Sequence, residues 1–383
     1  MTRPLPRPGD ERPLRIGVDA RELQGRPTGT GRYLRNLLRA FTRDHGDAVV
    51  AYFNGAAPAD AVLDHPNVSV RALARTRPGL LWQQRRLPAA ARQDALDVLF
   101  CPAYTCPLAA DLPRVTTVHD LSFFALPGDF TWREGLRRRL TVAASVRASR
   151  RVLTVSEFSR RELLARFPEA AGRVVAVPHG ADDDLPPAPD RGEARARLGL
   201  EGPFVLTVGT VFGRRRLPVL LRAMALLRRR HPRVRLEVVG DLRAHPPRNG
   251  PALAARLGLG STVRYTGFAS EAALADRYAA ADAAVFLSEY EGFGLPALEA
   301  MARGVPVVVS DRPALDEVFA GAAVAVPLED EAALAGALAR VLEDDALRRD
   351  LVARGHALAA RHSWAEAARL TRAALADAAA EGP

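Results

Sequence analysis

The chain alternates short apolar segments of strand length with longer segments of helical periodicity. This alternation restricts the folds that the chain can adopt more than any other feature of the sequence. The apolar segment 14–19, for example, is followed by a glycine-containing loop and a helix expected from Arg32. Such an alternation is typical of α/β folds with parallel sheets. In the first half, strands are expected at 14–19, 49–53, 68–72, 98–101, 114–119, 151–155 and 174–177.

A second alternating series begins after a break in the pattern. Residues 181–190, ADDDLPPAPD, contain too many Pro and Asp for the interior of an element, so they indicate a linker. We therefore predict an α/β chain of two Rossmann-like, doubly wound domains, 1–183 and 184–363, facing each other across a cleft. In the second half, strands are expected at 204–208, 235–239, 263–266, 283–287, 305–309 and 323–326.

The charge balance bears on the partners of the chain. Its 383 residues suit two domains, and its net charge is +10, with every basic residue an Arg because Lys is absent. A positive charge favours an anionic partner such as a nucleotide, a lipid head group or nucleic acid, although compositional bias is an alternative explanation. The Arg residues are spread along the chain without an aromatic-interleaved basic motif, so no nucleic acid is expected.

Location and cofactors are inferred from what the sequence lacks. Cys101 and Cys106 are too few for a zinc site or a disulfide framework, and we expect buried thiols in a reducing cytosol. Residues 1–13 do not resemble a signal peptide, and no run reaches the roughly 18 apolar residues of a membrane helix. A cytoplasmic protein is expected, without a metal or other cofactor, because no Asp cluster suits a metal.

The strongest motif is SEYEGFGLPALEAM, 288–301, which follows an expected strand and opens a helix. Gly292 and Gly294 allow the backbone to approach a ligand, and the free N–H groups of a helix start can hold a phosphate. Glu291 and Glu299 flank the turn, and carboxylates accept hydrogen bonds from sugar hydroxyls. The structural alternative is a strand–turn–helix in which Glu291 only complements the helix dipole.

Three weaker motifs lie at or just after the ends of expected strands. Arg214, Arg215 and Arg216 precede a helix, where guanidinium groups suit a diphosphate; a solvated basic turn is the alternative. The other two lie in the first half, and each is more often structural than functional when taken alone. They are the loop PTGTGRY with Gly29 and Gly31, which can approach a phosphate or sugar, and VHDLSFF, in which His119 can donate to a hydroxyl and Asp120 can orient it.

Together these motifs resemble those of the retaining glycosyltransferases called family 4. EGFGLPALEA is similar to the family's E-x7-E signature, in which the first Glu faces the donor sugar and the second binds the nucleotide ribose. The resemblance gives these roles to Glu291 and Glu299. It also places the backbone of Phe293, Gly294 and Leu295 against the donor phosphates and sugar.

The other motifs extend the resemblance over about 14–380. The segment 208–223, which includes Gly209, resembles VGT-x-x-P-R-K-N-L. Arg214 falls on the family's Arg, and Arg215 falls on its Lys, which meets the donor pyrophosphate. Arg and Lys are not interchangeable at bidentate sites, so this replacement bears on donor preference. PTGTGRY resembles a TGIGRY loop across the cleft from the donor. The segment ending at Phe268 resembles loops that line the nucleotide base. HDLSFF resembles a segment found in many mannosyltransferases. In that segment the histidine that matches His119 contacts the transferred sugar.

The resemblance implies a metal-independent retaining glycosyltransferase with His119, Glu291, Arg214 and Arg215 as catalytic residues. It would move a hexose, mannose by first expectation, from a GDP- or UDP-linked donor in the second domain to a hydroxyl of a sugar, lipid-linked or small-molecule acceptor. UDP-glucose and UDP-N-acetylglucosamine are alternative donors. A nucleotide-sugar binding protein without activity and an epimerase are alternative functions. The resemblance also implies that the last helix, 364–383, packs on the first domain.

One stretch suggests a further partner. Residues 131–151 carry seven Arg among Trp132, Leu136, Leu140 and Val142. Such a segment suits peripheral contact with an anionic membrane, here the inner face of the cell membrane, and a solvated helix face is the alternative.

Overall fold

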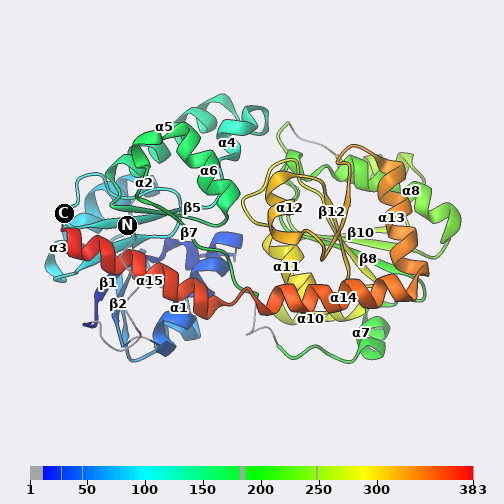
Figure 1. The fold of residues 1–383 in the computed structure, drawn as a ribbon, viewed down its shortest axis with the longest axis horizontal. Coiled ribbons are helices and arrows are strands. Elements are labelled where there is room, and N and C mark those ends of the chain that lie inside the picture. Colours follow the sequence, from blue (N-terminus) through cyan, green and yellow to red (C-terminus); the bar gives the residue numbers. More distant parts are fainter. Residues whose placement is uncertain (1–11, 27, 45, 182–185, 247–248, 383) are drawn as a thin grey trace. The chain divides into compact units, whose positions relative to one another are not determined.

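A computed structural model describes residues 12–26, 28–44, 46–181, 186–246 and 249–382 (Figure 1). Residues 1–11, Pro27 of the glycine-containing loop and 182–185 of the expected linker lie outside the described residues. The chain divides into two compact units. The first comprises the described residues up to Leu121, Leu136–Gly180 and those from Trp364, and the second comprises Ser122–Gly135 and Ala181–Ser363. The predicted boundary at 183/184 did not anticipate that Ser122–Gly135 groups with the second unit.

The sheet of the first unit contains seven parallel strands in the order β3-β2-β1-β4-β5-β6-β7. In chain order they are β1 Arg15–Asp19, β2 Ala48–Asn54, β3 Val68–Leu73, β4 Val98–Cys101, β5 Arg114–Val118, β6 Arg151–Thr154 and β7 Val174–Ala176. In the centre of the sheet, Val18 of β1 pairs with Ala51 of β2 and Phe100 of β4. These residues are buried, as expected for parallel strands covered on both faces. The seven strands expected here are confirmed, within a residue or two at their ends.

Helices α1 and α15 cover part of this sheet. The apolar face expected for α1, which includes Tyr33, Leu37 and Phe41, is buried. The helices of this unit are α1 Gly29–Asp44, α2 Gly79–Leu81, α3 Leu87–Gln93, α6 Glu157–Arg166 and α15 Trp364–Glu381, while α4 Ser122–Ala125 and α5 Trp132–Ala148 lie between β5 and β6.

The C-terminal helix α15 is part of the first unit. Its Arg372 is 7% exposed and forms an ion pair with Asp47 at 2.8 Å. Asp47 also accepts the Leu14 N–H at 2.8 Å, next to the start of β1. At the beginning of α15, the Trp364 ring stacks on His179 with ring centres 5.7 Å apart. The helix is thus fixed to this unit by both a buried charge pair and aromatic packing.

The second unit repeats the architecture with six parallel strands in the order β10-β9-β8-β11-β12-β13. They are β8 Phe204–Val208, β9 Arg235–Val239, β10 Val263–Thr266, β11 Ala283–Phe286, β12 Val307–Ser310 and β13 Val324–Val326. The six strands expected in this half are confirmed within two residues. The helices are α7 Arg191–Leu198, α8 Leu217–Arg230, α9 Gly250–Arg256, α10 Glu271–Ala280, α11 Leu295–Ala302, α12 Pro313–Phe319, α13 Glu331–Glu343 and α14 Asp345–Ala360.

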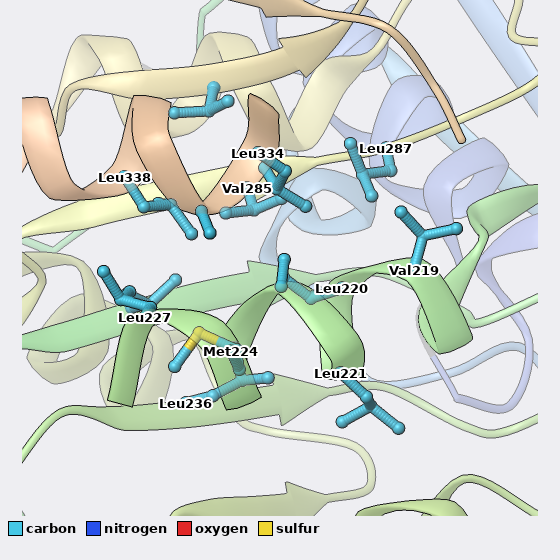
Figure 2. Packing of buried hydrophobic residues seen from close by; sticks show 14 of the residues in the cluster. Val219, Leu220, Leu221, Met224, Leu227, Leu236, Val285, Leu287, Leu334 and Leu338 are labelled. Carbon is cyan, nitrogen blue, oxygen red and sulfur yellow. The ribbon is translucent and has the colours of Figure 1, made fainter. Parts of the chain in front are cut away.

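The core of the second unit lies where α8 and α13 cover the sheet. Figure 2 shows Leu220 and Leu227 of α8 facing Leu334 and Leu338 of α13, with Val285 of β11 beside them. All five side chains are 3% exposed or less. Full burial of such a side chain contributes roughly 1.5–3 kcal/mol, so this layer gives the following loops a rigid base. No helix in the described part of the chain is both long and apolar enough to cross a membrane.

Candidate functional site

The strand order of the second sheet reverses between β8 and β11. From β8 the chain adds β9 and β10 on one side, whereas β11, β12 and β13 extend on the other. In open parallel sheets, ligands bind at the carboxyl ends of the strands where the order reverses, because the two loops diverge there. The loops after β8 and β11 carry the arginine motif and the E-x7-E motif. The topology therefore brings the two strongest motifs to neighbouring loops.

Backbone contacts hold the loop after β8. Gly209 has φ of 118°, and its N–H donates to Val239 O at 2.9 Å. A Cβ on Gly240, at the end of the next strand, would lie 2.3 Å from Gly209 O, so the two loop starts touch through their backbones. Arg216, after the Gly213–Arg215 turn, has φ of 46°, which is uncommon for a residue with a side chain. Such a conformation persists where surrounding contacts hold it.

Arg215 and Glu291 are in direct contact. Their side chains form an ion pair at 3.1 Å and are 16% and 14% exposed. The Arg215 guanidinium also lies 4.0 Å from the centre of the Phe286 ring, and the Ser288 hydroxyl donates to Glu291 Oε2 at 3.2 Å. Partial burial and several partners fix both charged groups at the loop between β11 and α11. Two residues that the motifs assigned to one donor site are therefore adjacent.

The two other arginines of the motif have different surroundings. Arg216 pairs with Glu289 at 2.6 Å and with Glu329 at 2.8 Å. Arg214 is 8% exposed, and its guanidinium lies 4.6 Å from the centre of the Phe212 ring. The carbonyl of Arg214 accepts the Glu289 N–H at 2.8 Å, which ties the loop after β8 to the loop after β11.

Gly294 allows the chain to enter α11. Its φ of 101° is in the left-handed region, and a Cβ would lie 2.8 Å from the Phe319 ring and 3.1 Å from Leu315. No side chain caps α11, and its first turn contains no acid. Pro296 has no N–H, and the Ala297 N–H donates to Gly294 O at 2.9 Å, so an anion at this turn would meet the Leu295 N–H and the partial positive charge of the helix start. Leu295 opens the helix, and the preceding Gly292 and Phe293 are buried, with the Phe293 ring edge-on to a histidine of the same unit.

Glu299 lies deeper than Glu291. It is 1% exposed, and its carboxylate accepts a hydrogen bond from the Tyr278 hydroxyl of α10 at 3.2 Å. The role in ribose binding therefore stays a prediction, since the carboxylate is held in the interior of this unit. Phe268 differs, because it follows β10 and is 50% exposed. Its open ring at the carboxyl edge of the sheet suits stacking of a base.

His119 follows β5 in the first unit and is 9% exposed. Its Nε2 lies 2.8 Å from Pro102 O, and since a carbonyl only accepts, Nε2–H is the donor. Burial lowers the pKa of His119 below 6.5, while the hydrogen bond to Pro102 O and the charge of Asp120 oppose that shift. In the neutral ring Nδ1 is then an acceptor. This corrects the expectation that His119 donates to a sugar hydroxyl: the ring can accept a hydrogen bond from that hydroxyl through Nδ1.

The two glycines of the N-terminal motif have different surroundings. Gly29 begins α1, with open space where a Cβ would lie. Gly31 packs on the turn after β1, where a Cβ would lie 2.5 Å from Glu22 O. The backbone of that turn, rather than a ligand, therefore requires glycine at position 31. Their predicted contacts with the donor stay predictions.

Sequence reasoning missed a polar network at the order reversal of the first sheet, between β1 and β4. Asp19 ends β1 and is 4% exposed; it accepts from Arg21 at 2.6 Å and from Gln83 at 2.9 Å. Gln83 also donates to Thr105 O at 2.8 Å. Tyr104 has φ of 62°, and its ring centre lies 5.5 Å from that of His119. The strand end at Asp19 was a usable signal, but nothing in the sequence marks Gln83 as its partner.

Within the described ranges, no group of three or more His, Cys, Asp or Glu side chains is arranged to hold a metal ion. Cys101 and Cys106 are both buried free thiols, and burial raises the pKa of Cys101 well above its usual value. The prediction of buried thiols is confirmed for this pair.

The chain matches known families along most of its length. Residues 27–185 match the family described as Glycosyltransferase Family 4, and residues 190–357 match Glycosyl transferases group 1. The O-antigen chain mannosyltransferase B of Escherichia coli is 30% identical over 370 residues, which cover 88% of this chain and 93% of that protein.

Solved structures share the fold. Sucrose-phosphate synthase from Thermosynechococcus elongatus has a TM-score of 0.76 at 23% identity, covering 95% of this chain and 100% of that one. The Anabaena protein HepE, solved in complex with UDP-glucose, has a TM-score of 0.73 at 20% identity, covering 95% and 99%.

Two doubly wound units with these structural neighbours define the GT-B fold. The chain belongs to glycosyltransferase family 4, with a group 1 domain in its second half. The fold, the family and the transferase activity expected from the motifs are thereby confirmed.

Proposed function

We propose that the protein is a retaining hexosyltransferase that takes its sugar from a nucleotide-diphosphate donor bound to the second unit. The observation that carries this proposal is the Arg215–Glu291 pair beside the uncapped start of α11. A diphosphate placed there would meet a guanidinium, the Leu295 N–H and the partial positive charge of the helix start, all of which favour anions. Glu291, released from Arg215 by the diphosphate, would then accept hydrogen bonds from sugar hydroxyls.

The chemical step follows from where charge develops. As the glycosidic bond to the diphosphate breaks, the sugar becomes oxocarbenium-like and negative charge grows on the leaving phosphate. Arg214, Arg215 and the start of α11 would stabilise that charge, a type of contact whose loss costs roughly 10²–10³-fold in rate. His119 would hold the transferred sugar by accepting a hydrogen bond from a sugar hydroxyl at Nδ1. Attack of the acceptor from the leaving-group face would retain the anomeric configuration without a metal or other cofactor.

Mannose from GDP-mannose is the first choice of donor. The E. coli relative is a mannosyltransferase, and the His119 segment resembles those of mannosyltransferases. UDP-glucose and UDP-N-acetylglucosamine are the alternative donors, and HepE was solved with UDP-glucose. The acceptor hydroxyl would belong to a sugar, a lipid-linked glycan or a small molecule, on the cytoplasmic side of the membrane.

A donor panel tests this proposal. The purified protein is melted with GDP-mannose, UDP-glucose and UDP-N-acetylglucosamine, each at about 100 times a micromolar Kd, where binding adds about 2.7 kcal/mol. We expect one donor to raise the melting midpoint by roughly 5–10 °C and to be turned over at an unchanged rate after EDTA treatment. An inverted anomer in the product would refute retention. A donor that binds but is neither transferred nor slowly hydrolysed indicates a binding protein without activity. An epimerised donor indicates an epimerase.

We also propose that α5 contacts an anionic membrane. Trp132, Leu136 and Leu140 are 73%, 47% and 62% exposed, and their spacing of four residues places them on one helix face. The helix contains five Arg and one Glu. Arg133 lies over the Trp132 ring at 5.3 Å, and neither it nor Arg137 forms an ion pair with a described residue. Apolar side chains flanked by unpaired Arg suit insertion among anionic head groups.

Vesicle sedimentation separates this proposal from a solvated helix face. Each Arg near an anionic surface contributes about 1 kcal/mol, so Arg133→Gln with Arg137→Gln should weaken binding to phosphatidylglycerol vesicles roughly 30-fold. The charge-matched control is Arg229→Gln with Arg349→Gln, two exposed Arg of the second unit that also lack ion pairs with described residues. Equal binding to phosphatidylcholine and phosphatidylglycerol, or an equal loss in the control, would refute the membrane proposal.

A further inference from the structure

The segment between His119 and α5 contributes to the loop of the proposed donor site. Ser122–Gly135 groups with the second unit although its neighbours on both sides belong to the first. Within this segment, Pro127–Asp129 form a single 3-10 turn. Asp129, the last residue of that turn, is the residue that reaches the arginine loop.

Asp129 caps the arginine turn from outside. The Gly213–Arg215 turn starts at Phe212, and no side chain of its own caps it. Instead, the Arg214 N–H donates to Asp129 Oδ2 at 3.0 Å. The first N–H groups of a helical turn lack partners within it, so a carboxylate at this position satisfies one of them and complements their partial positive charge.

The approach of Asp129 also explains Gly213. A Cβ on Gly213 would lie 2.5 Å from Asp129 Oδ1, so any larger residue would push the carboxylate away. Both carboxylate oxygens of Asp129 thus face the turn. Because the Arg214 carbonyl accepts the Glu289 N–H at 2.8 Å, this residue is held on one side by Asp129 and on the other by the loop after β11.

We infer that Asp129 is a positioning residue for Arg215 and hence for the donor diphosphate. It fixes the Gly213–Arg214 peptide, one residue before Arg215, whose guanidinium contacts Glu291. The effect on the loop is a property of the free protein, whereas the effect on the diphosphate rests on the proposed function.

The test compares Asp129→Ala and Asp129→Asn with Asp344→Ala. Asp344 is a matched control because its carboxylate caps α14 of the same unit, accepting the Ala346 and Leu347 N–H groups. Hydrogen–deuterium exchange is measured without ligand on peptides covering 209–217. Binding of UDP and GDP is measured by calorimetry, and melting midpoints report on global stability.

We expect Asp129→Ala to speed exchange of the 209–217 backbone and to weaken nucleotide binding roughly tenfold or more, as for loss of a hydrogen bond to a charged group. Asp129→Asn keeps an accepting oxygen and should recover part of both effects. Asp344→Ala should change neither, although it lowers the melting midpoint.

Unchanged exchange at 209–217 in Asp129→Ala would overturn the inference, as would nucleotide binding equal to that of the unsubstituted protein. If the unsubstituted protein binds neither UDP nor GDP, the proposed donor site fails. The exchange result still decides in that case whether Asp129 orders the loop.

Discussion

Replacing Gly294 by alanine should damage the proposed donor site. The residue has φ of 101°, and its Cβ position is closed by Phe319 at 2.8 Å, Leu315 at 3.1 Å and Phe286 at 3.3 Å. Real Cβ contacts of this kind are longer, so the helix start or the aromatic rings must move.

Two costs add at this position. A left-handed backbone costs a residue with a side chain roughly 1–2 kcal/mol, and forcing an extra methyl into a packed site costs typically 1–3 kcal/mol. We therefore expect Gly294→Ala to destabilise the protein by about 2–5 kcal/mol. Gly321 provides the matched control, because its φ is 78° and nothing lies within 4 Å of its Cβ position. Gly321→Ala should incur only the backbone cost of about 1–2 kcal/mol.

The assay compares the two variants in melting and in nucleotide binding. For a domain of this size, 1 kcal/mol shifts the midpoint by about 2–4 °C, so Gly294→Ala should melt roughly 2–12 °C below Gly321→Ala. Binding of UDP or GDP should fall only in Gly294→Ala, since only that change moves the N–H groups at the start of α11. Equal midpoints in the two variants, or unimpaired nucleotide binding by Gly294→Ala, would refute the reasoning.

Three other outcomes are expected. Arg215→Ala and Glu291→Ala should each lower turnover about 10²–10³-fold with the preferred donor; a variant near the original rate does not have the proposed role. Turnover should fall on acidification with an apparent pKa below 6.5, because protonation of His119 removes the Nδ1 acceptor; a His119→Gln variant that keeps this acid limb would assign it elsewhere. The same lowered pKa means that the unfolded chain takes up the proton first, so His119 also destabilises the fold as pH drops below about 6.5. Asp47→Ala should cost about 3–5 kcal/mol, since it leaves Arg372 buried without its carboxylate, and a melting shift under about 2 °C contradicts this.

The strands were predictable because parallel strands buried on both faces are continuous apolar runs. Val205, Leu206 and Val285 are such residues, and each is 2% exposed or less. Several short helices were not predicted from the sequence. Gly79–Gln93 contains a proline and two adjacent arginines and shows no sustained apolar periodicity, and α12 spans only Pro313–Phe319. These segments are helical because the sheet beneath them buries one side, which is information that a local pattern does not contain.

The site was predictable only where a motif places neighbouring residues at a strand end. The contact of Arg215 with Glu291 follows from two motifs on adjacent strands of one doubly wound sheet. The separate surroundings of Arg214 depend on side-chain packing, which spacing does not specify. Which ring nitrogen of His119 carries the proton depends on one carbonyl, that of Pro102, which is seventeen positions away in the chain.

The two order reversals of this fold differ in charge, and the difference suits a transfer reaction. In the second unit, Arg215 and Glu291 form a pair that a diphosphate can displace, because each is 14–16% exposed and the adjacent helix start is uncapped. In the first unit, Asp19 at the corresponding position is 4% exposed and already engaged by Arg21 and Gln83. A charged ligand would have to break that network at the cost of a buried charge. His119, which follows β5 of the same sheet, is buried with a lowered pKa and in its neutral form suits an uncharged hydroxyl. The proposed function therefore asks for an anionic ligand in one unit and a neutral one in the other, which fits this difference in charge.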